Sequence, residues 1–357
     1  MSEATQLTRG GRLMDATRAI QRALHARGAG AEPAPARPAG NADADVIDVE
    51  SRLIASDERD GPVPAFGEAG DAEQWTKGTF THQGRMIDYM LFVPAGAGEA
   101  PHPRPLILML HGCTQNPADF AAGTRMNEHA RALGAVVLYP AQTHHANGQK
   151  CWNWFKPQHQ QRGRGEPALL AALTQRIVKE NGVDSARVYA AGLSAGGAMA
   201  DILGHCYPDV FAAVGVHSGL PHGAASDVIS ALAVMKSGMP AQAKVRDAVE
   251  GVAGVATPPT IVFHGDADGT VHESNGMAIV LATQAAAEIC EGQSAGGQRF
   301  TRTLYAATPG RGVVEHWRLH GAGHAWSGGS SHGSYTEPRG IDASREMLRF
   351  FLTHRLS

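Results

Sequence analysis

The sequence lacks any long apolar run and any strong excess of charge of one sign. No stretch of the 357 residues approaches the roughly 20 consecutive apolar residues that a membrane-spanning helix needs. The formal net charge is only -3 at pH 7, so neither nucleic acid nor an anionic membrane is indicated as the main partner. We therefore expect no transmembrane segment and no nucleic-acid partner.

Cysteine is scarce, and other clusters of chemically active side chains are missing. The four cysteines, Cys113, Cys151, Cys206 and Cys290, allow three full pairings, and their spacing does not choose among them. Histidine occurs 18 times, but no group of histidines and cysteines has the spacing of metal ligands. No glycine-rich phosphate-binding loop is present. We expect neither a metal nor another cofactor.

The amino-terminal part lacks the apolar core of a secretory signal. Residues 1–27 contain five arginines, and their apolar residues recur at helical spacing, which predicts a short amphipathic helix. Residues 28–70 are rich in proline, alanine and glycine and predict a flexible linker. The third part, residues 71–357, is expected to be the folded domain. The missing signal favours the cytoplasm, with secretion by another route left open, and the oligomeric state is not predicted.

Strand-like and helix-like patterns alternate through the domain. Apolar runs that predict buried strands lie at 106–110, 135–139, 188–191, 212–217, 260–264 and 313–319. Helical patterns lie at 118–133, 166–181, 275–289 and 341–354, and residues 77–81 and 86–93 predict an antiparallel hairpin. The alternation predicts an α/β fold whose sheet is mostly parallel and doubly wound. Two insertions, 142–165 and 219–256, are of the kind that often covers an active site.

The segment Gly192-Leu193-Ser194-Ala195-Gly196 is the most informative motif. It follows the strand at 188–191 and precedes a helical pattern at 197–203. A serine between glycines at a strand-to-helix turn is a nucleophile elbow, and its sharp turn leaves room only for small neighbours. The motif predicts that Ser194 is the nucleophile in acyl transfer, most simply in ester hydrolysis.

A serine nucleophile needs a histidine to take its proton and an acid to orient that histidine. The elbow topology predicts the chain order Ser, Asp, His, with the acid and the histidine after later strands. Asp268 is favoured as the acid because it lies deeper in its loop, whereas Asp266 is interpreted as a turn former bonded to local backbone. His324 is favoured as the base, and His320, nearer its strand, is interpreted as structural.

The reaction also needs N–H donors for the oxyanion of its tetrahedral intermediate. We expect one donor to be the amide of Ala195, the residue after the nucleophile. The second is expected to be the amide of Cys113, in the loop after the strand at 106–110. His111-Gly112 in that loop has the usual form of an oxyanion loop, and a plain tight turn is the alternative interpretation.

Polar and aromatic side chains in loops near the predicted site are candidates for substrate binding. Trp152, Trp154 and Trp326 fall in such loops and could form an apolar surface. Core packing is the alternative for each tryptophan. We predict Gln115, Trp152 and Trp326 as substrate-binding residues.

Several motifs in this order resemble the polyhydroxybutyrate depolymerase-like esterases, α/β-hydrolases that also include feruloyl and acetylxylan esterases. The resemblance covers roughly residues 75–355. The motifs that carry it are His111-Gly112-Cys113-Thr114-Gln115, Tyr139-Pro140, Cys151-Trp152-Asn153-Trp154, Gly192-Leu193-Ser194-Ala195-Gly196-Gly197, His264-Gly265-Asp266-Ala267-Asp268-Gly269-Thr270-Val271, Asn275 and Gly323-His324-Ala325-Trp326. It implies Ser194, Asp268 and His324 as nucleophile, acid and base.

The resemblance also implies a disulfide between Cys113 and Cys151. A bridge is plausible because both cysteines are expected near the carboxyl ends of neighbouring strands, and two buried free thiols are the alternative. Cys206 and Cys290 are interpreted as ordinary buried thiols.

The function implied is a cofactor-free serine ester hydrolase that acts through an acyl-enzyme. Its expected substrates are short hydroxyalkanoate esters or oligomers. The ester is expected to be either a small molecule or part of a polymer. The alternatives are a feruloyl- or acetylxylan-type carbohydrate esterase and an acyltransferase, in which a second alcohol outcompetes water. A non-catalytic binding module on the same fold is disfavoured, because every part of a triad is present in the sequence.

Overall fold

The computed structural model describes residues 72–96, 103–238, 257–281, 286–307 and 312–356. All of them belong to one structural unit, residues 64–357. The expected helix in 1–27 and linker in 28–70 lie outside the described residues. Within the described residues, no helix combines the length and the hydropathy that crossing a membrane requires.

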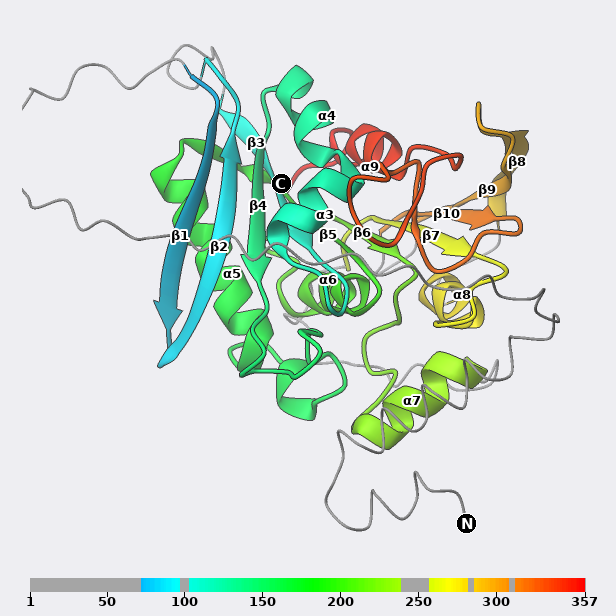
Figure 1. Cartoon of the computed structure of the whole chain (residues 1–357), viewed down its shortest axis with the longest axis horizontal. Coiled ribbons are helices and arrows are strands. Elements are labelled where there is room, and N and C mark those ends of the chain that lie inside the picture. Colours follow the sequence, from blue (N-terminus) through cyan, green and yellow to red (C-terminus); the bar gives the residue numbers. More distant parts are fainter. Residues whose placement is uncertain (1–71, 97–102, 239–256, 282–285, 308–311, 357) are drawn as a thin grey trace, which may run out of the picture. The chain divides into compact units, whose positions relative to one another are not determined.

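A ten-stranded sheet runs through this unit in the order β1-β2-β4-β3-β5-β6-β7-β10-β9-β8 (Figure 1). Strands β4, β3, β5, β6, β7 and β10 pair in parallel, whereas β1 and β2 on one side and β9 and β8 on the other pair antiparallel. The strands span β1 Gln74–His82, β2 Arg85–Val93, β3 Arg104–Leu110, β4 Val136–Ala141, β5 Val183–Leu193, β6 Ala213–His217, β7 Thr260–Gly265, β8 Ala286–Gln293, β9 Arg299–Tyr305 and β10 Val314–Leu319.

Helices cover both faces of the sheet. The helices are α3 Pro117–Thr124, α4 Met126–Leu133, α5 Gly165–Glu180, α6 Ala195–Cys206, α7 Val228–Ser237, α8 Ser274–Leu281 and α9 Ala343–Phe351, with a short 3₁₀ helix η1 at Pro157–His159. Alternate residues of β3 point to opposite faces. Leu106 and Leu108 lie in one buried cluster with α5 and α6, and Ile107 and Met109 lie in another with α3, α4 and α9. The apolar run of β3 is therefore buried on both sides.

The expected α/β architecture is confirmed, including the amino-terminal hairpin β1–β2, but two helices were predicted wrongly. The helix expected over 118–133 is two helices, because Arg125 between them has a left-handed φ of 55°. The helix expected over 275–289 ends at Leu281, and the strand β8 begins at Ala286. The side chains of β8 are mostly exposed, so pairing with β9, rather than a local apolar pattern, defines this strand.

The parallel strands bring their carboxyl ends to one edge of the sheet. Ser194 follows β5, Asp268 follows β7 and His324 follows β10. Backbone hydrogen bonds join neighbouring strand ends at this edge: Ser194 N donates to His217 O at 2.9 Å, and Ser218 N donates to Phe263 O at 2.8 Å. The fold therefore delivers the three predicted catalytic residues to the same edge.

Candidate active site

The elbow at Ser194 is tight and strained. Ser194 has φ 58° and ψ -119°, a conformation that L residues rarely adopt, and α6 begins at the next residue. A Cβ on Gly196 would lie 2.0 Å from Leu110 O, and a Cβ on Gly192 would lie 2.4 Å from the carbonyl carbon of Gly196. Only glycine fits at these two positions, as the motif predicts. The turn leaves Ser194 at the amino end of a helix, with 8% of its surface exposed.

A short hydrogen bond joins the predicted acid and base. His324 Nδ1 donates to Asp268 Oδ2 at 2.7 Å, and Asp268 Oδ1 accepts from the amides of Thr270 and Val271 at 2.8 and 2.9 Å. Burial alone raises the pKa of Asp268, but the bond from His324 and the two amide bonds outweigh it, so the pKa lies below its usual value. The ionised carboxylate makes Nδ1 of His324 the donor and leaves Nε2 to accept a proton.

His217, at the end of β6, connects the serine to this pair. Its backbone carbonyl accepts the Ser194 amide, and its ring stacks on Trp326, with 5.1 Å between ring centroids. Nε2 accepts from the Ser327 amide at 3.0 Å, so Nδ1 is left to donate to Ser218 Oγ at 3.2 Å. Burial, helped by His264 and His324, lowers the pKa of His217 to about 3. His217 is thus a neutral residue that holds the segment after His324 against β6.

The nucleophile and the base are connected through these neighbours. Among the described residues, the Ser194 hydroxyl and the His324 ring share no hydrogen bond. Nucleophile–base hydrogen bonds are often long in unliganded enzymes and tighten when substrate binds. The structure places all three candidate residues at one edge of the sheet, and the direct contact between Ser194 and His324 stays a prediction.

The loop after β3 lies beside the serine. A Cβ on Gly112 would lie 3.7 Å from Ser194 Cβ. Within the part of the chain that the structure describes, the amides of Cys113 and Ala195 donate to no protein acceptor. Free N–H groups next to a nucleophile are what an oxyanion hole requires. Their assignment as the two oxyanion donors stays a prediction.

Several contacts hold this loop in place. The disulfide that the resemblance implies joins Cys113 to Cys151. Gln115 Oε1 accepts from the Gly112 amide at 2.9 Å, and Gln115 Nε2 donates to Asp119 Oδ2 at 3.0 Å. These bonds restrain the backbone that carries the predicted donor.

The other two cysteines have different surroundings from each other. Cys206 is a buried free thiol, as expected, and burial raises its pKa to about 12. Cys290 is exposed, so its predicted burial is wrong. The reason is its place on β8, the outermost strand of the sheet.

The predicted substrate-binding side chains are almost fully buried. Trp152, Trp326 and Gln115 are 0%, 1% and 2% exposed. Trp152 Nε1 donates to His111 O at 3.1 Å, and Trp326 Nε1 donates to Ser344 Oγ at 3.1 Å. In this structure the three side chains support the loops around Ser194, and their contact with substrate stays a prediction.

Strained backbone gathers around this site. Besides Ser194, the non-glycine residues with positive φ include Thr114 (67°), Lys150 (53°), Ser218 (50°) and Tyr335 (53°). Thr114 follows Cys113, Lys150 precedes Cys151, and Ser218 follows His217. The hydroxyls of Thr114 and Tyr335 are 3.2 Å apart, and Tyr335 is 47% exposed. Strain of this kind is typical of functional sites. Sequence analysis missed Tyr335, because no motif surrounds it.

A buried carboxylate organises the long loop after β4, and sequence analysis missed this residue too. Glu166 accepts from Gln142 Nε2 at 2.7 Å and from the Asn153 amide and side chain at 2.7 and 2.6 Å. Burial raises the pKa of Glu166, but the His159 ring 3.2 Å away and the hydrogen bonds from Asn153 outweigh it, and the net shift is downward. The only signal in the sequence was a glutamate at the start of a helical pattern.

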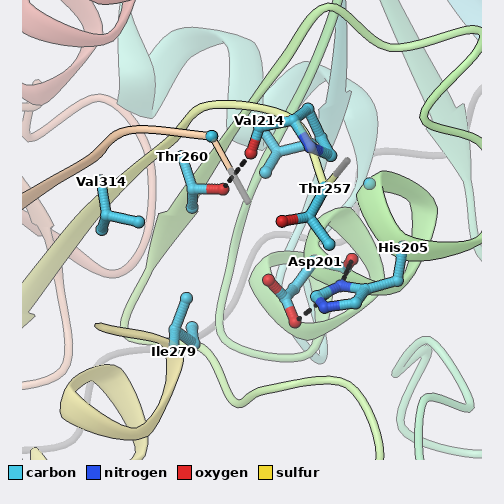
Figure 2. Close-up of a pocket in the computed structure, with 10 residues that line it drawn as sticks. Asp201, His205, Val214, Thr257, Thr260, Ile279 and Val314 are labelled. Atoms are coloured by element: carbon cyan, nitrogen blue, oxygen red, sulfur yellow. Dashed lines mark hydrogen bonds and ion pairs between the residues drawn. The ribbon is translucent and has the colours of Figure 1, made fainter. Parts of the chain in front are cut away.

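A pocket lies at the other edge of the sheet (Figure 2). Val214, Thr260 and Val314 line it from the amino ends of β6, β7 and β10, and α6 contributes Asp201 and His205. His205 Nδ1 donates to Asp201 O at 2.9 Å. Because Ser194 follows the carboxyl end of β5, this pocket is separate from the candidate active site.

In the described residues, no group of three or more His, Cys, Asp or Glu side chains is arranged to hold a metal ion.

The parallel sheet, its helices on both faces and the strained serine elbow define an α/β-hydrolase. A solved structure agrees: the acetyl xylan esterase from Aspergillus awamori matches with a TM-score of 0.60 and 16% identity, over 77% of this chain and 98% of that one. At this identity the likeness shows the fold alone. The sequence pattern of the family "Esterase PHB depolymerase" matches residues 87–299, more than half of the chain. The chain therefore belongs to this esterase family, which confirms the resemblance seen in its motifs.

Curated relatives include two kinds of esterase. Poly(3-hydroxyalkanoate) depolymerase C of Paucimonas lemoignei is 31% identical over 245 residues, which cover 65% of this chain and 56% of the relative. Feruloyl esterase B of Thermothelomyces thermophilus is 32% identical over 196 residues, which cover 52% of this chain and 65% of the relative. The chain thus spans between about half and two thirds of the length of these two relatives.

Proposed function

We propose that this protein is a carboxylic ester hydrolase with Ser194 as nucleophile, His324 as general base and Asp268 as the acid that orients it. The observation that carries the proposal is the 2.7 Å Asp268–His324 hydrogen bond at the sheet edge that also holds the strained elbow. Membership of an esterase family supports the same reaction class. Residues 71–357 are proposed as the catalytic domain.

The proposed reaction has two steps. Ser194 Oγ attacks the ester carbonyl while His324 Nε2 takes its proton, and the ionised Asp268 stabilises the imidazolium that forms. The amides of Cys113 and Ala195 receive the oxyanion. His324 then passes the proton to the leaving alcohol, which departs and leaves an acyl-enzyme. Water, activated by the same histidine, attacks the acyl-enzyme and releases the acid.

The proposed substrates are short hydroxyalkanoate esters or oligomers. The family match and the depolymerase relative from Paucimonas lemoignei support this choice. The similar identity of the feruloyl esterase relative favours a carbohydrate esterase as the second candidate. An acyltransferase would use the same residues and differ only in the acceptor of the acyl group.

A substrate panel tests these assignments. The purified full chain is assayed on p-nitrophenyl esters, hydroxybutyrate oligomers and methyl ferulate, with Ser194→Ala as control. We expect kcat/KM to be highest for the hydroxybutyrate oligomers and activity on all substrates to vanish in the variant. A preference for methyl ferulate would favour the carbohydrate esterase, and no hydrolysis of any ester by folded protein would refute an esterase.

Added alcohols separate the hydrolase from the acyltransferase. In their presence we expect the free acid to remain the main product. If the transferred ester dominates at modest alcohol concentrations, the protein is an acyltransferase and the hydrolase assignment is wrong.

A further inference from the structure

A second carboxylate–imidazole pair lies next to the proposed catalytic one. His320 Nδ1 donates to Asp266 Oδ2 at 2.9 Å, and the Gly321 amide donates to Asp266 Oδ1 at 2.6 Å. These partners lie 54 and 55 residues further along the chain. The interpretation of Asp266 as a turn former bonded to local backbone is therefore wrong. His320 makes structural contacts, as expected. Its partner is Asp266, which lies two residues before the proposed catalytic acid Asp268.

A third residue, Thr301, contacts this pair. The three residues together do not form a second active site. Thr301 Oγ1 lies 2.9 Å from His320 Nε2. With Asp266 ionised and Nδ1 donating, Nε2 accepts the Thr301 proton, which gives the order hydroxyl, imidazole, carboxylate of a triad. However, Thr301 lies within β9, which pairs with β10 on one side and β8 on the other. Its position has neither a strained elbow nor a helix amino terminus for an oxyanion.

The contacts of this pair continue the β7–β10 ladder toward the catalytic residues. The parallel pairing of β7 with β10 ends at Gly265 and Leu319. Beyond it, Asp266 N donates to Leu319 O and Ala267 N donates to Ala322 O, both at 3.1 Å. The next contact in this series is the bond between Asp268 and His324. The side-chain bonds of Asp266 therefore lie between the last residues of the β7–β10 pairing and the Asp268–His324 pair.

The loop that carries His324 needs such support. It contains Gly321, with φ 72°, and Gly323, and glycines give a backbone wide conformational freedom. The side chains of His320 and Asp266 are only 27% and 21% exposed. The contact is therefore less screened by solvent than an ordinary surface pair.

We propose that Asp266 and His320 are positioning residues that fix the loop 320–324 and thereby set the orientation of the His324 imidazole toward Ser194. Thr301 keeps His320 in the tautomer that donates to Asp266. The inference rests on the proposed function for its kinetic consequences, but the geometry that it describes can be measured without any substrate.

The kinetic test compares Asp266→Asn and His320→Ala with a matched control, Asp209→Asn. Asp209 pairs with Arg162 at 2.6 Å, and it follows α6 near the amino end of β6, at the other edge of the sheet. Misplacing a catalytic group by about 1 Å costs up to about 100-fold in rate, so we expect kcat to fall about 10- to 100-fold in the two variants, with KM little changed. Asp209→Asn should keep the wild-type kcat.

Two further variants separate positioning from general loss of structure. His320→Asn keeps a short N–H donor that can reach Asp266 and should recover part of the kcat that His320→Ala loses. The double variant Asp266→Asn/His320→Ala should be no slower than the slower single variant, because both changes break one unit. Losses that multiply, an unchanged kcat in both single variants, or no recovery with His320→Asn would overturn the proposal. If Asp266→Asn does not fold, the loss in His320→Ala and its partial recovery in His320→Asn carry the comparison.

A substrate-free measurement completes the test. The His324 Nδ1 proton, held by Asp268, gives a far-downfield proton NMR signal that can be assigned by its loss in His324→Gln. We expect this signal to shift or broaden in Asp266→Asn and His320→Ala and to stay in place in Asp209→Asn. An unchanged signal in all variants would refute positioning. If the wild-type protein hydrolyses no ester, the proposed function fails, while this signal still decides the positioning claim.

Discussion

The two edges of the central sheet both carry an aspartate close to a histidine, yet their settings differ. At the carboxyl edge, Asp268 and His324 are bonded side chain to side chain, beside a strained serine. At the amino edge, His205 Nδ1 donates to the backbone carbonyl of Asp201, and the nearest approach to the Asp201 carboxylate is 3.6 Å. On the proposed assignment, the comparison means that an aspartate near a histidine does not mark a catalytic site by itself. A nucleophile and free N–H donors must converge on the same point.

Removing the nucleophile should have the largest effect. Loss of a serine nucleophile typically lowers kcat by about 10⁶-fold, so Ser194→Ala should have almost no esterase activity. The matched change at the other edge, His205→Ala, should keep the wild-type kcat when rates are corrected for folded protein. Equal losses in the two variants would remove the distinction between the edges.

Neutralising the acid should have the next largest effect. Asp268→Asn replaces an ionised acceptor with an amide, so the His324 tautomer with its proton on Nδ1 is no longer favoured, and we expect kcat to fall about 10⁴-fold. The counterpart Asp201→Asn should change kcat little, even if it lowers the thermal midpoint. Both variants are compared by steady-state kinetics and by circular dichroism. Wild-type rates in Asp268→Asn would show that another acid serves His324.

Opening the disulfide should have an intermediate effect. Cys113→Ser/Cys151→Ser releases a cross-link between residues 38 positions apart, and we expect the free energy of unfolding to fall by about 2–4 kcal/mol. A less restrained Cys113 amide should also lower kcat, by less than the roughly 10²- to 10³-fold that follows loss of an oxyanion donor. Cys206→Ser is the control for removing a thiol. Unchanged kinetics in the double variant would show that the loop needs no cross-link.

The smallest effect on esterase activity is expected from a buried histidine between the two edges, which acts on the pH dependence of stability instead. Burial, helped by His264 and Arg318, lowers the pKa of His316 in β10 to about 3. Between the ordinary histidine pKa and that value, only the unfolded chain takes up this proton, so falling pH destabilises the folded state by about 1.4 kcal/mol per pH unit. His316→Leu should remove this dependence, so the stability gap between variant and wild type should shift in the variant's favour as the pH falls.

Urea unfolding between about pH 7 and about pH 4 measures this slope. Exposed His144, on the loop after β4, provides the control variant His144→Ala, which should keep the wild-type slope. A slope in His316→Leu equal to that of wild type would contradict a folded-state pKa well below the ordinary value.

The site residues that could be predicted from sequence are those placed by strand ends. Apolar runs located the strands before Ser194, Asp268 and His324. Because parallel strands end at one edge of the sheet, the three residues were expected to lie at the same edge. The Asp266–His320 pair follows the ends of the same two strands. It was not predicted, because strand ends do not tell which side chains of two facing loops pair, and Asp266 was interpreted as bonded within its own loop. The exposed Tyr335 beside Thr114 escaped prediction because no motif surrounds it.

One part of the fold that escaped prediction lies at the far end of the sheet. The strand β8 has mostly exposed side chains and exists through its pairing with β9. Tertiary pairing of this kind overrides weak local preferences. By contrast, residues 106–110 of β3 form an unbroken apolar run buried on both faces, and the sequence alone was sufficient to predict this strand.

Covalent labelling by an organophosphonate tests the central claim most directly, because it asks whether His324 activates Ser194. Mass spectrometry of the labelled full chain should show one adduct, on Ser194, and the rate of its formation should fall by about 10³-fold or more in His324→Gln. The rate should be unchanged in His205→Ala. An adduct on another residue, or equal labelling rates in wild type and His324→Gln, would contradict the account.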